Sequence, residues 1–201
     1  YSGIFYAEAF FDEKLPSWLK GTVHALHKFG IPLAISCDNA KALVKKPHKH
    51  MAELTTAMRQ LCAYYDMEAY VSQSYSPSQK SETERAVGIC ERDVFTELEG
   101  ASKWMFAQDL NQVNEKIAAL VEKCNNKSFT KDSLSSRMSV YLQEERPKLQ
   151  KAPLMPFEMF QWHIFKADKY GKVKLAEDNK RYLVEYTQAN KEVVCALTDT
   201  K

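Results

Sequence analysis

Short apolar runs alternate with amphipathic helical stretches through the first half of the chain, and this alternation limits the fold more than any other feature. The three runs, residues 4–11, 31–36 and 67–72, have the length and composition of buried strands. The stretches with helical spacing of apolar residues lie between Asp12 and Gly30, from Met51 to Tyr65 and from about Lys80 to Glu99. A strand followed by a helix, three times over, predicts an α/β fold in which helices cover a sheet.

The pattern changes in the second half of the chain. An amphipathic helix is predicted from Asp109 to Cys124, and a short helical stretch from Ser139 to Arg146. Pro147, Pro153 and Pro156 then mark a linker, which predicts a domain boundary near residue 150. Residues 151–201 hold short alternating runs separated by turn residues. We therefore predict an α/β core over residues 1–150 and a small antiparallel β-barrel or sheet over residues 151–201.

Composition and charge exclude several classes of protein. The chain has 201 residues, 45% of them hydrophobic, which allows a real core and excludes a disordered chain. Its net charge of +2 permits nucleic-acid binding only through a local basic surface. Five cysteines without a CxxC pair argue for reduced thiols in the cytoplasm and against a zinc module. No apolar run is long enough to cross a membrane, and because the chain begins at Tyr1 without a signal peptide we expect a piece of a longer protein.

Two acids stand in distinctive settings. Asp38 follows the second apolar run, and Glu84 lies one turn into the helix that opens after the loop Ser76-Pro77-Ser78. A carboxylate at a strand end facing one on a helix is typical of a metal site, and two Mg²⁺ ions can hold the attacking and leaving oxygens of a phosphodiester. The plainer alternatives are an Asx turn at Asp38 and a solvated helix residue at Glu84, paired with Lys80. Glu82 lies on another face of the same helix.

Basic residues near these acids are candidate DNA contacts. Lys80 lies one turn before Glu84 on the same face, and Arg85 is its neighbour in sequence. The densest basic cluster adjoins Asp38, where it serves either as a contact to the DNA backbone or as a solvated loop. Its members are Lys41, Lys45, Lys46, His48, Lys49 and His50. The pair His48 and His50 has no third ligand nearby in sequence, which argues against a metal there.

Other polar and aromatic residues have ordinary explanations. Asp12 precedes a helix, where capping is the expected role, and the position near a helix end predicts surface placement for His24 and His27. The aromatic residues of the tail either fill a small barrel core or stack on nucleic acid, and we expect the former. They are Trp162, Phe165, Tyr170, Tyr182 and Tyr186.

These motifs together resemble the catalytic core of DDE transposases of the IstA type. The resemblance begins with Tyr6-Ala7-Glu8-Ala9 and Trp18, and continues through Phe29-Gly30-Ile31-Pro32 into Asp38-Asn39-Ala40-Lys41-Ala42-Leu43-Val44. It runs on through Tyr64-Tyr65, Ser76-Pro77-Ser78-Gln79-Lys80 and Glu84-Arg85-Ala86-Val87, and ends with Glu144-Glu145-Arg146, Leu149 and Pro153-Leu154-Met155-Pro156. It therefore covers nearly the whole chain.

The resemblance implies an RNase H-like fold in which three acids bind two divalent ions, Mg²⁺ or Mn²⁺, and a β-barrel follows the core. Asp38 matches the second acid and Glu84 the third. The first acid would lie on a strand upstream of Tyr1, so we expect the piece alone to be inactive, because two ions need a bridging ligand.

The implied partners are transposon ends and target DNA, further copies of the chain, and an IstB-type AAA+ ATPase helper, with no membrane partner. The implied location is the bacterial cytoplasm, at the nucleoid. Two alternatives stay open: a non-catalytic DNA- or protein-binding piece of a degenerate or trimmed transposase, and a retroviral-type integrase core, which the motifs and tail fit less well.

Overall fold

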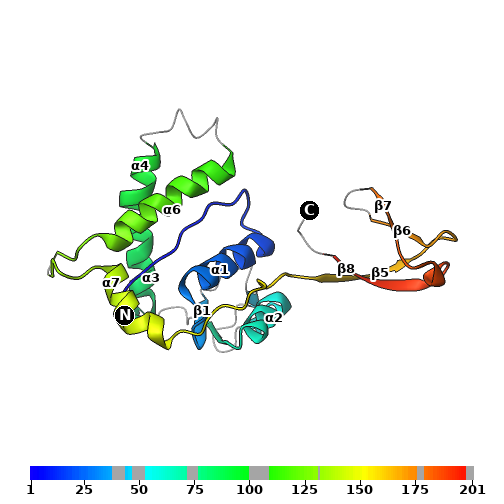
Figure 1. Cartoon of the computed structure of the whole chain (residues 1–201), viewed down its shortest axis with the longest axis horizontal. Helices are drawn as coiled ribbons and strands as arrows, with labels where there is room; N and C mark the ends of the chain where they lie inside the picture. The colour runs from blue at the N-terminus through cyan, green and yellow to red at the C-terminus, as the bar shows by residue number, and fades with distance from the viewer. Residues whose placement is uncertain are drawn as a thin grey trace. The chain divides into compact units, whose positions relative to one another are not determined.

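The computed structural model describes residues 1–37, 44–46, 53–71, 77–99, 109–130, 132–175 and 179–197. Contacts within the chain divide it into two units, Tyr1–Phe157 and Glu158–Lys201, whose ribbons are drawn in Figure 1. The sequence placed this division near residue 150, at the linker prolines. No helix in these ranges has the length and apolar character needed to cross a membrane.

Unit 1 contains a parallel strand pair with a helix in the connection between its strands. Strand β1 (Ala34–Cys37) pairs with β4 (Glu68–Val71), in register from Ala34 opposite Glu68 to Cys37 opposite Val71. The helix α2 (Thr56–Tyr64) lies between them in sequence, and its first turn is capped by the Thr55 hydroxyl, which accepts from the Met58 N–H. A parallel pair joined through a helix is the α/β arrangement that the alternating pattern predicted.

Helix α1 (Leu15–Phe29) begins later than the sequence suggested. Its buried face consists of Leu19, Val23 and Leu26, at helical spacing. Asp12 lies before the first turn, where its carboxylate accepts hydrogen bonds from the Lys14 N–H at 3.1 Å and the Ser17 hydroxyl at 2.7 Å. The capping role predicted for Asp12 was therefore wrong, because the helix begins two residues later and its N-cap is Lys14, without a side-chain cap. Asp12 instead orders the segment that leads into the helix.

Two of the predicted strands differ from the structure. Residues 4–11 form no regular strand, although Phe5 is buried, because side chains of helix α6 (Leu110–Asn126) supply the backbone's hydrogen bonds. The second run is a strand only from Ala34 onward, and Leu33 is 73% exposed. Ile31 instead forms an isolated antiparallel bridge with Gln150, with two backbone hydrogen bonds of 2.9 Å.

The long helix predicted over residues 80–99 consists of three consecutive helical pieces. They are α3 (Pro77–Ile89), the π-helical segment η1 (Cys90–Phe95) and α4 (Thr96–Glu99). At the end of η1 the hydroxyl of Thr96, the first residue of α4, donates to the Glu91 carbonyl at 3.2 Å, five residues earlier, as the wider π turn allows. These pieces pack against α6 to form a core cluster of unit 1. Its buried members are Phe5, Ile89, Val94, Leu98, Ile117, Val121 and Cys124.

Short helical pieces end unit 1. The helix α7 (Arg137–Val140) starts with a capping box between Ser136 and Ser139, and is followed by the π-helical segment η2 (Tyr141–Glu145) and the 3₁₀ turn η3 (Arg146–Lys148). The Tyr141 hydroxyl donates to the Phe29 carbonyl at the end of α1, and so ties this region to the first helix.

Unit 2 is antiparallel, as predicted, but its described strands do not close into a barrel. Strand β5 (Gln161–Lys166) pairs with β8 (Glu192–Leu197), and β6 (Lys172–Lys174) pairs with β7 (Arg181–Leu183), as two separate sheets beside the 3₁₀ turn η4 (Tyr186–Gln188). Each described strand therefore pairs along only one edge, whereas a barrel needs pairing along both.

The tail aromatics do not fill a barrel core either. Tyr170 is 61% exposed and Tyr186 is 77% exposed. The buried residues of unit 2 within the described ranges are smaller, with Ala167 and Val173 each 2% exposed. The expectation of an aromatic core was therefore wrong for these two tyrosines, because a pair of two-stranded sheets leaves at least one face in solvent.

Candidate active site

The candidate acid Asp38 follows the best-buried residue of β1 in the chain. Cys37, the last residue of the strand, is 5% exposed, and burial together with the nearby Cys62 thiol raises its pKa to about 11. Asp38 comes next in the chain but lies outside the described residues, so its distance from Glu84 is not tested. What the structure does provide is a strand end held in the core, from which the residue after Cys37 continues.

Glu84 is presented to solvent by α3. Its side chain is exposed and has no hydrogen bond or ion pair with another described residue. One turn later, a Cβ at Gly88 would meet no atom within 4 Å, so this face of the helix is open. The opposite face is held in the core by Ala86, Ile89 and Cys90. The helix is thus fixed while the Glu84 carboxylate stays available to a ligand.

The predicted DNA contacts are only partly described. Lys41, His48, Lys49 and His50 lie outside the described residues, and the side chains of Lys45, Lys46 and Lys80 do as well. Lys45 and Lys46 belong to strand β2 (Val44–Lys46), which pairs antiparallel with β3 (Glu53–Leu54). Part of the predicted basic loop is therefore a strand. Lys80 lies in α3, and Arg85 is exposed on the same helix.

No metal cluster is assembled by the residues with assigned positions. They include no group of three or more His, Cys, Asp or Glu side chains that could hold an ion. Glu84 nevertheless fits a hard cation by its chemistry, because it is an exposed carboxylate without a competing cation from another described residue.

A partly buried hydrogen-bond network around Glu8 was not predicted from the sequence. The Glu8 carboxylate, 14% exposed, accepts from the Tyr6 hydroxyl at 2.8 Å and lies 2.8 Å from Nδ1 of His24. Burial and this hydrogen bond raise the pKa of Tyr6. His27 likewise meets the Tyr65 hydroxyl at 2.9 Å. Both histidines therefore have specific partners rather than plain surface positions, which no local sequence signal indicates because the partners lie on other segments.

Comparison with known proteins finds sequence similarity to transposases. The chain matches no protein-family model. A protein of Sinorhizobium fredii named "Putative transposase y4bL/y4kJ/y4tB" is 33% identical over 162 residues, which cover 80% of this chain and 30% of that protein. The chain is a relative of bacterial transposases. A second protein of this bacterium, "Putative transposase y4uI", is 24% identical and is covered over 31% of its length. "Putative transposase for insertion sequence IS408" of Burkholderia multivorans is 25% identical over 148 residues, 73% of this chain and 28% of that protein.

This transposase relative spans less than a third of the length of the curated proteins that it matches. Its fold is similar to solved integrase structures. The simian T-cell lymphotropic virus intasome in complex with PP2A regulatory subunit B56 gamma matches with a TM-score of 0.54 at 14% identity, over 96% of this chain and 69% of that chain. The catalytic core domain of BIV integrase matches with a TM-score of 0.50 at 18% identity, over 73% and 83%. The predicted integrase-like α/β core is thereby confirmed.

Proposed function

We propose that this chain forms part of the catalytic core of a DDE-type transposase, which cuts and joins DNA with the help of divalent metal ions. In this proposal Asp38 and Glu84 are two of the three metal-binding acids. The observation that carries it is the setting of Glu84: an exposed carboxylate on a helix anchored in the core, in a relative of transposases with an integrase-like fold.

Mg²⁺ or Mn²⁺ is the proposed cofactor, because carboxylate oxygens are its preferred ligands. Two such ions, when bound, activate water or a DNA 3′-hydroxyl and stabilise the leaving oxygen. Glu84 would hold the metal, and the core contacts of Ala86 and Ile89 would keep its helix in place. Buried Cys37 would fix the strand end from which Asp38 extends.

The wider assembly is also a proposal. We infer an IstA-type protein in which the remaining acid comes from outside these 201 residues, because the matched relatives are much longer. Such a protein would act as a multimer on transposon ends and target DNA in the bacterial cytoplasm, at the nucleoid, with an IstB-type AAA+ helper. Lys41, Lys45, Lys46, Lys80 and Arg85 would contact the DNA backbone.

The test is a transposition assay with the complete protein and the two ends of its own element. Asp38→Asn and Glu84→Gln each replace a charged ligand by a neutral amide of the same shape. Each should lower strand transfer by about 100-fold or more while the circular dichroism spectrum stays unchanged. Glu82→Gln is the matched control, because it makes the same change on another face of α3 and should leave activity near normal.

Two results would contradict the proposal. Strand transfer at the normal level in a folded Asp38→Asn or Glu84→Gln protein would remove that residue from the site. A complete protein that binds its element ends but neither cuts nor joins them in Mg²⁺ or Mn²⁺ would point instead to a DNA-binding piece without chemistry.

A further inference from the structure

A cavity opens on the surface of unit 1 between the C-terminal half of α6 and the segments η1 and α4, which Figure 1 shows crossing one another. Its volume is about 620 Å³, within the range of sites that bind small ligands or single side chains. None of the residues that line it belongs to the proposed metal or DNA contacts. They are Arg92, Asp93, Thr96, Glu97, Leu120, Lys123, Cys124, Asn126 and Lys127. We call it the α4–α6 cavity.

The carboxylates that line the α4–α6 cavity are already paired with cations. Arg92 holds Asp93 through a two-point contact, with hydrogen bonds of 2.7 and 3.0 Å. The ammonium of Lys123 donates to Glu97 at 2.9 Å. Each carboxylate on the cavity wall is thus neutralised by a neighbouring cation.

Two further cations lie at the same end of α6. Lys127 is exposed and lines the cavity, and Arg137 donates to the Cys124 carbonyl at 3.3 Å while lying over the Phe129 ring. Neither forms an ion pair with a carboxylate in the described part of the chain. Arg137 does not line the cavity itself, but its hydrogen bond to the carbonyl of Cys124, a lining residue, holds it beside the cavity. The charges of both cations also lower the pKa of Asp93, after its hydrogen bond to Arg92. The cavity therefore carries a surplus of positive charge.

The inner surface of the cavity is partly apolar. Leu120 is half-buried and packs against the core cluster, and Cys124 is 7% exposed. Burial raises the pKa of the Cys124 thiol, so it is neutral and contributes apolar surface. A ligand that fits must combine an apolar group with negative charge.

We propose that the α4–α6 cavity binds an acidic peptide segment of a partner protein, with one apolar side chain against Leu120 and Cys124 and its carboxylates at Lys127 and Arg137. A concave site suits a single side chain better than a DNA backbone, whose phosphates run along the outside of the duplex. The proposal does not depend on the catalytic role of Glu84.

The experiment is an NMR titration of the ¹⁵N-labelled 201-residue chain with a synthetic peptide that has one leucine flanked by aspartate and glutamate. The expected result is a set of amide shifts confined to residues 92–97 and 120–127. Thr96→Trp should abolish them, because an indole at this exposed position fills the cavity without changing its charge. Lys127→Glu should weaken binding by about fivefold or more. Lys20→Glu, which makes the same charge change on an exposed position of α1, should leave binding unchanged.

Three results would overturn the proposal. One is the absence of shifts at the cavity with the peptide at millimolar concentration. Another is equal binding of a control peptide with asparagine and glutamine in place of the acids, since this would remove the role of charge. The last is a short DNA duplex that produces the same shifts at lower concentration than the peptide, which would make the cavity a nucleic-acid contact.

Discussion

The side-chain amide of Asn125 hydrogen-bonds both backbone groups of Phe5, as a neighbouring β-strand would. Its Oδ1 accepts from the Phe5 N–H at 3.3 Å and its Nδ2 donates to the Phe5 carbonyl at 2.9 Å. Asn114, on the same face of α6, repeats the contact with Ala9 at 2.7 and 3.0 Å. Three helical turns rise about 16 Å, close to the length of four extended residues, so the two amides match the segment. Helix α6 thus takes the place of a strand beside residues 5–9, as the ribbon in Figure 1 shows.

We expect Asn125→Ala to lower the free energy of unfolding by about 2–4 kcal/mol. The change removes two hydrogen bonds and leaves the Phe5 N–H and carbonyl without their partners. The site is shielded from water, because Asn125 is only 1% exposed, so the loss is not made up by solvent. Urea unfolding followed by circular dichroism measures the loss. Asn126→Ala is the matched control, because Asn126 is exposed and bonds only the Glu122 carbonyl of its own helix, so its cost should stay below about 0.5 kcal/mol. Equal losses in the two variants would show that the amide pairing contributes little.

The same contact explains which parts of the fold the sequence could predict. Helix α1 follows from local periodicity, because its apolar residues repeat at helical spacing. Strands β1 and β4 follow from short apolar runs, although each strand is exposed on one face and not buried on both as predicted. The run from Ile4 to Phe11 has the composition of a strand, but whether it forms a ladder depends on what lies beside it. Its partners are more than a hundred positions away in sequence, and an asparagine within a helix gives no sign of that role.

The candidate site, like the fold, could be predicted from the sequence only in part. The predicted helix at Glu84 is present as α3, and its side chain is exposed, opposite the core contacts of Ala86 and Ile89. Exposure agrees with a metal ligand and equally with the plainer alternative of a solvated helix residue. The approach of Asp38 to Glu84 stays a prediction, because Asp38 lies outside the described residues. The barrel was wrong for the described strands, since alternation identifies strands and cannot say along which edges they pair.

Glu145 should make stability depend on acid pH. Burial raises the pKa of its carboxyl, but hydrogen bonds from the Ser2 N–H and hydroxyl, each 2.7 Å, oppose burial, and the pKa lies below the usual 4.5. A lowered folded pKa means that the stabilisation is complete above the unfolded value and is lost as pH falls through the folded one.

The measurement is urea unfolding of Glu145→Gln and of the unchanged chain at several pH values from 7 downward. The difference in unfolding free energy should be largest at pH 7 and should shrink below about pH 4.5. Glu144→Gln, an exposed neighbour, should show no comparable trend. A difference for Glu145→Gln that is independent of pH would exclude ionisation as the source.

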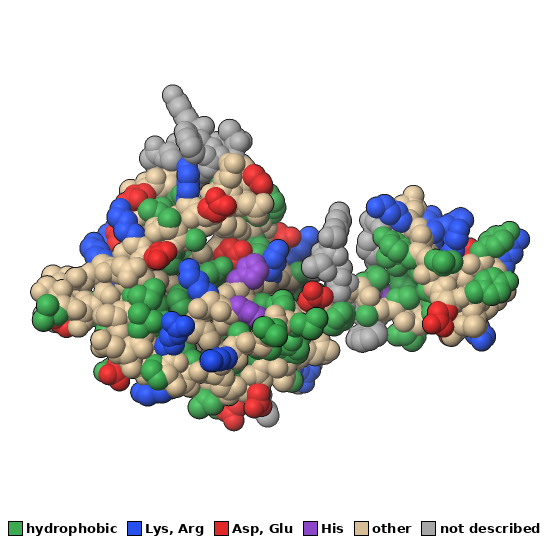
Figure 2. Space-filling model, viewed as in Figure 1, with side chains coloured by type: hydrophobic (Ala, Val, Ile, Leu, Met, Phe, Trp, Pro, Cys, Tyr) green, Lys and Arg blue, Asp and Glu red, His purple; other side chains and the backbone are tan. Residues whose placement is uncertain are grey.

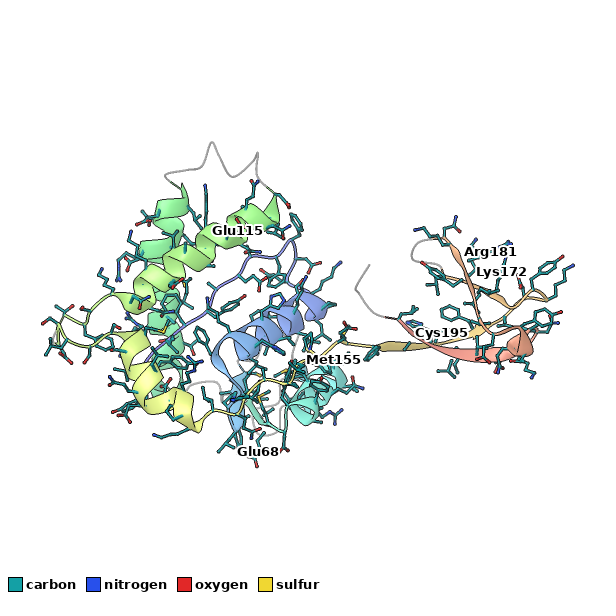
Figure 3. All side chains as sticks on the ribbon, viewed as in Figure 1. Glu68, Glu115, Met155, Lys172, Arg181 and Cys195 are labelled. Atoms are coloured by element: carbon teal, nitrogen blue, oxygen red, sulfur yellow. The ribbon has the colours of Figure 1, made fainter. Side chains whose placement is uncertain are left out.

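Cys37 should react slowly with alkylating reagents in the folded chain. With a pKa of about 11, only about one part in a thousand of the thiol is ionised at pH 8, and the side chain is also 5% exposed. Cys195, half-buried on β8 and labelled in Figure 3, should react at least ten times faster. Iodoacetamide labelling with peptide mass spectrometry gives both rates. Similar rates for the two thiols would mean that β1 opens readily just before Asp38.

The hairpin of β6 and β7 gives unit 2 a basic face. Lys174 lies opposite Arg181, and Lys172 lies opposite Leu183, so these three cations project to one side of the hairpin. The side chain between the two lysines, Val173, is 2% exposed and faces the other way. Figure 2 shows lysine and arginine side chains on the upper edge of this unit and also at its outer tip and lower edge, and Figure 3 labels Lys172 and Arg181 on the two strands.

If this face contacts DNA, the salt dependence of binding should report it directly. Each cation that neutralises a phosphate contributes about 0.9 to the slope of log affinity against log salt. We expect Lys172→Gln combined with Lys174→Gln to reduce the slope by about 1.8, measured by fluorescence anisotropy with a labelled duplex over a range of KCl concentrations. Lys166→Gln combined with Lys191→Gln removes the same charge from one end of the β5 and β8 sheet and is the matched control. The same loss of slope in both double variants would assign the effect to net charge, and no loss in either would place the DNA contacts elsewhere in the chain.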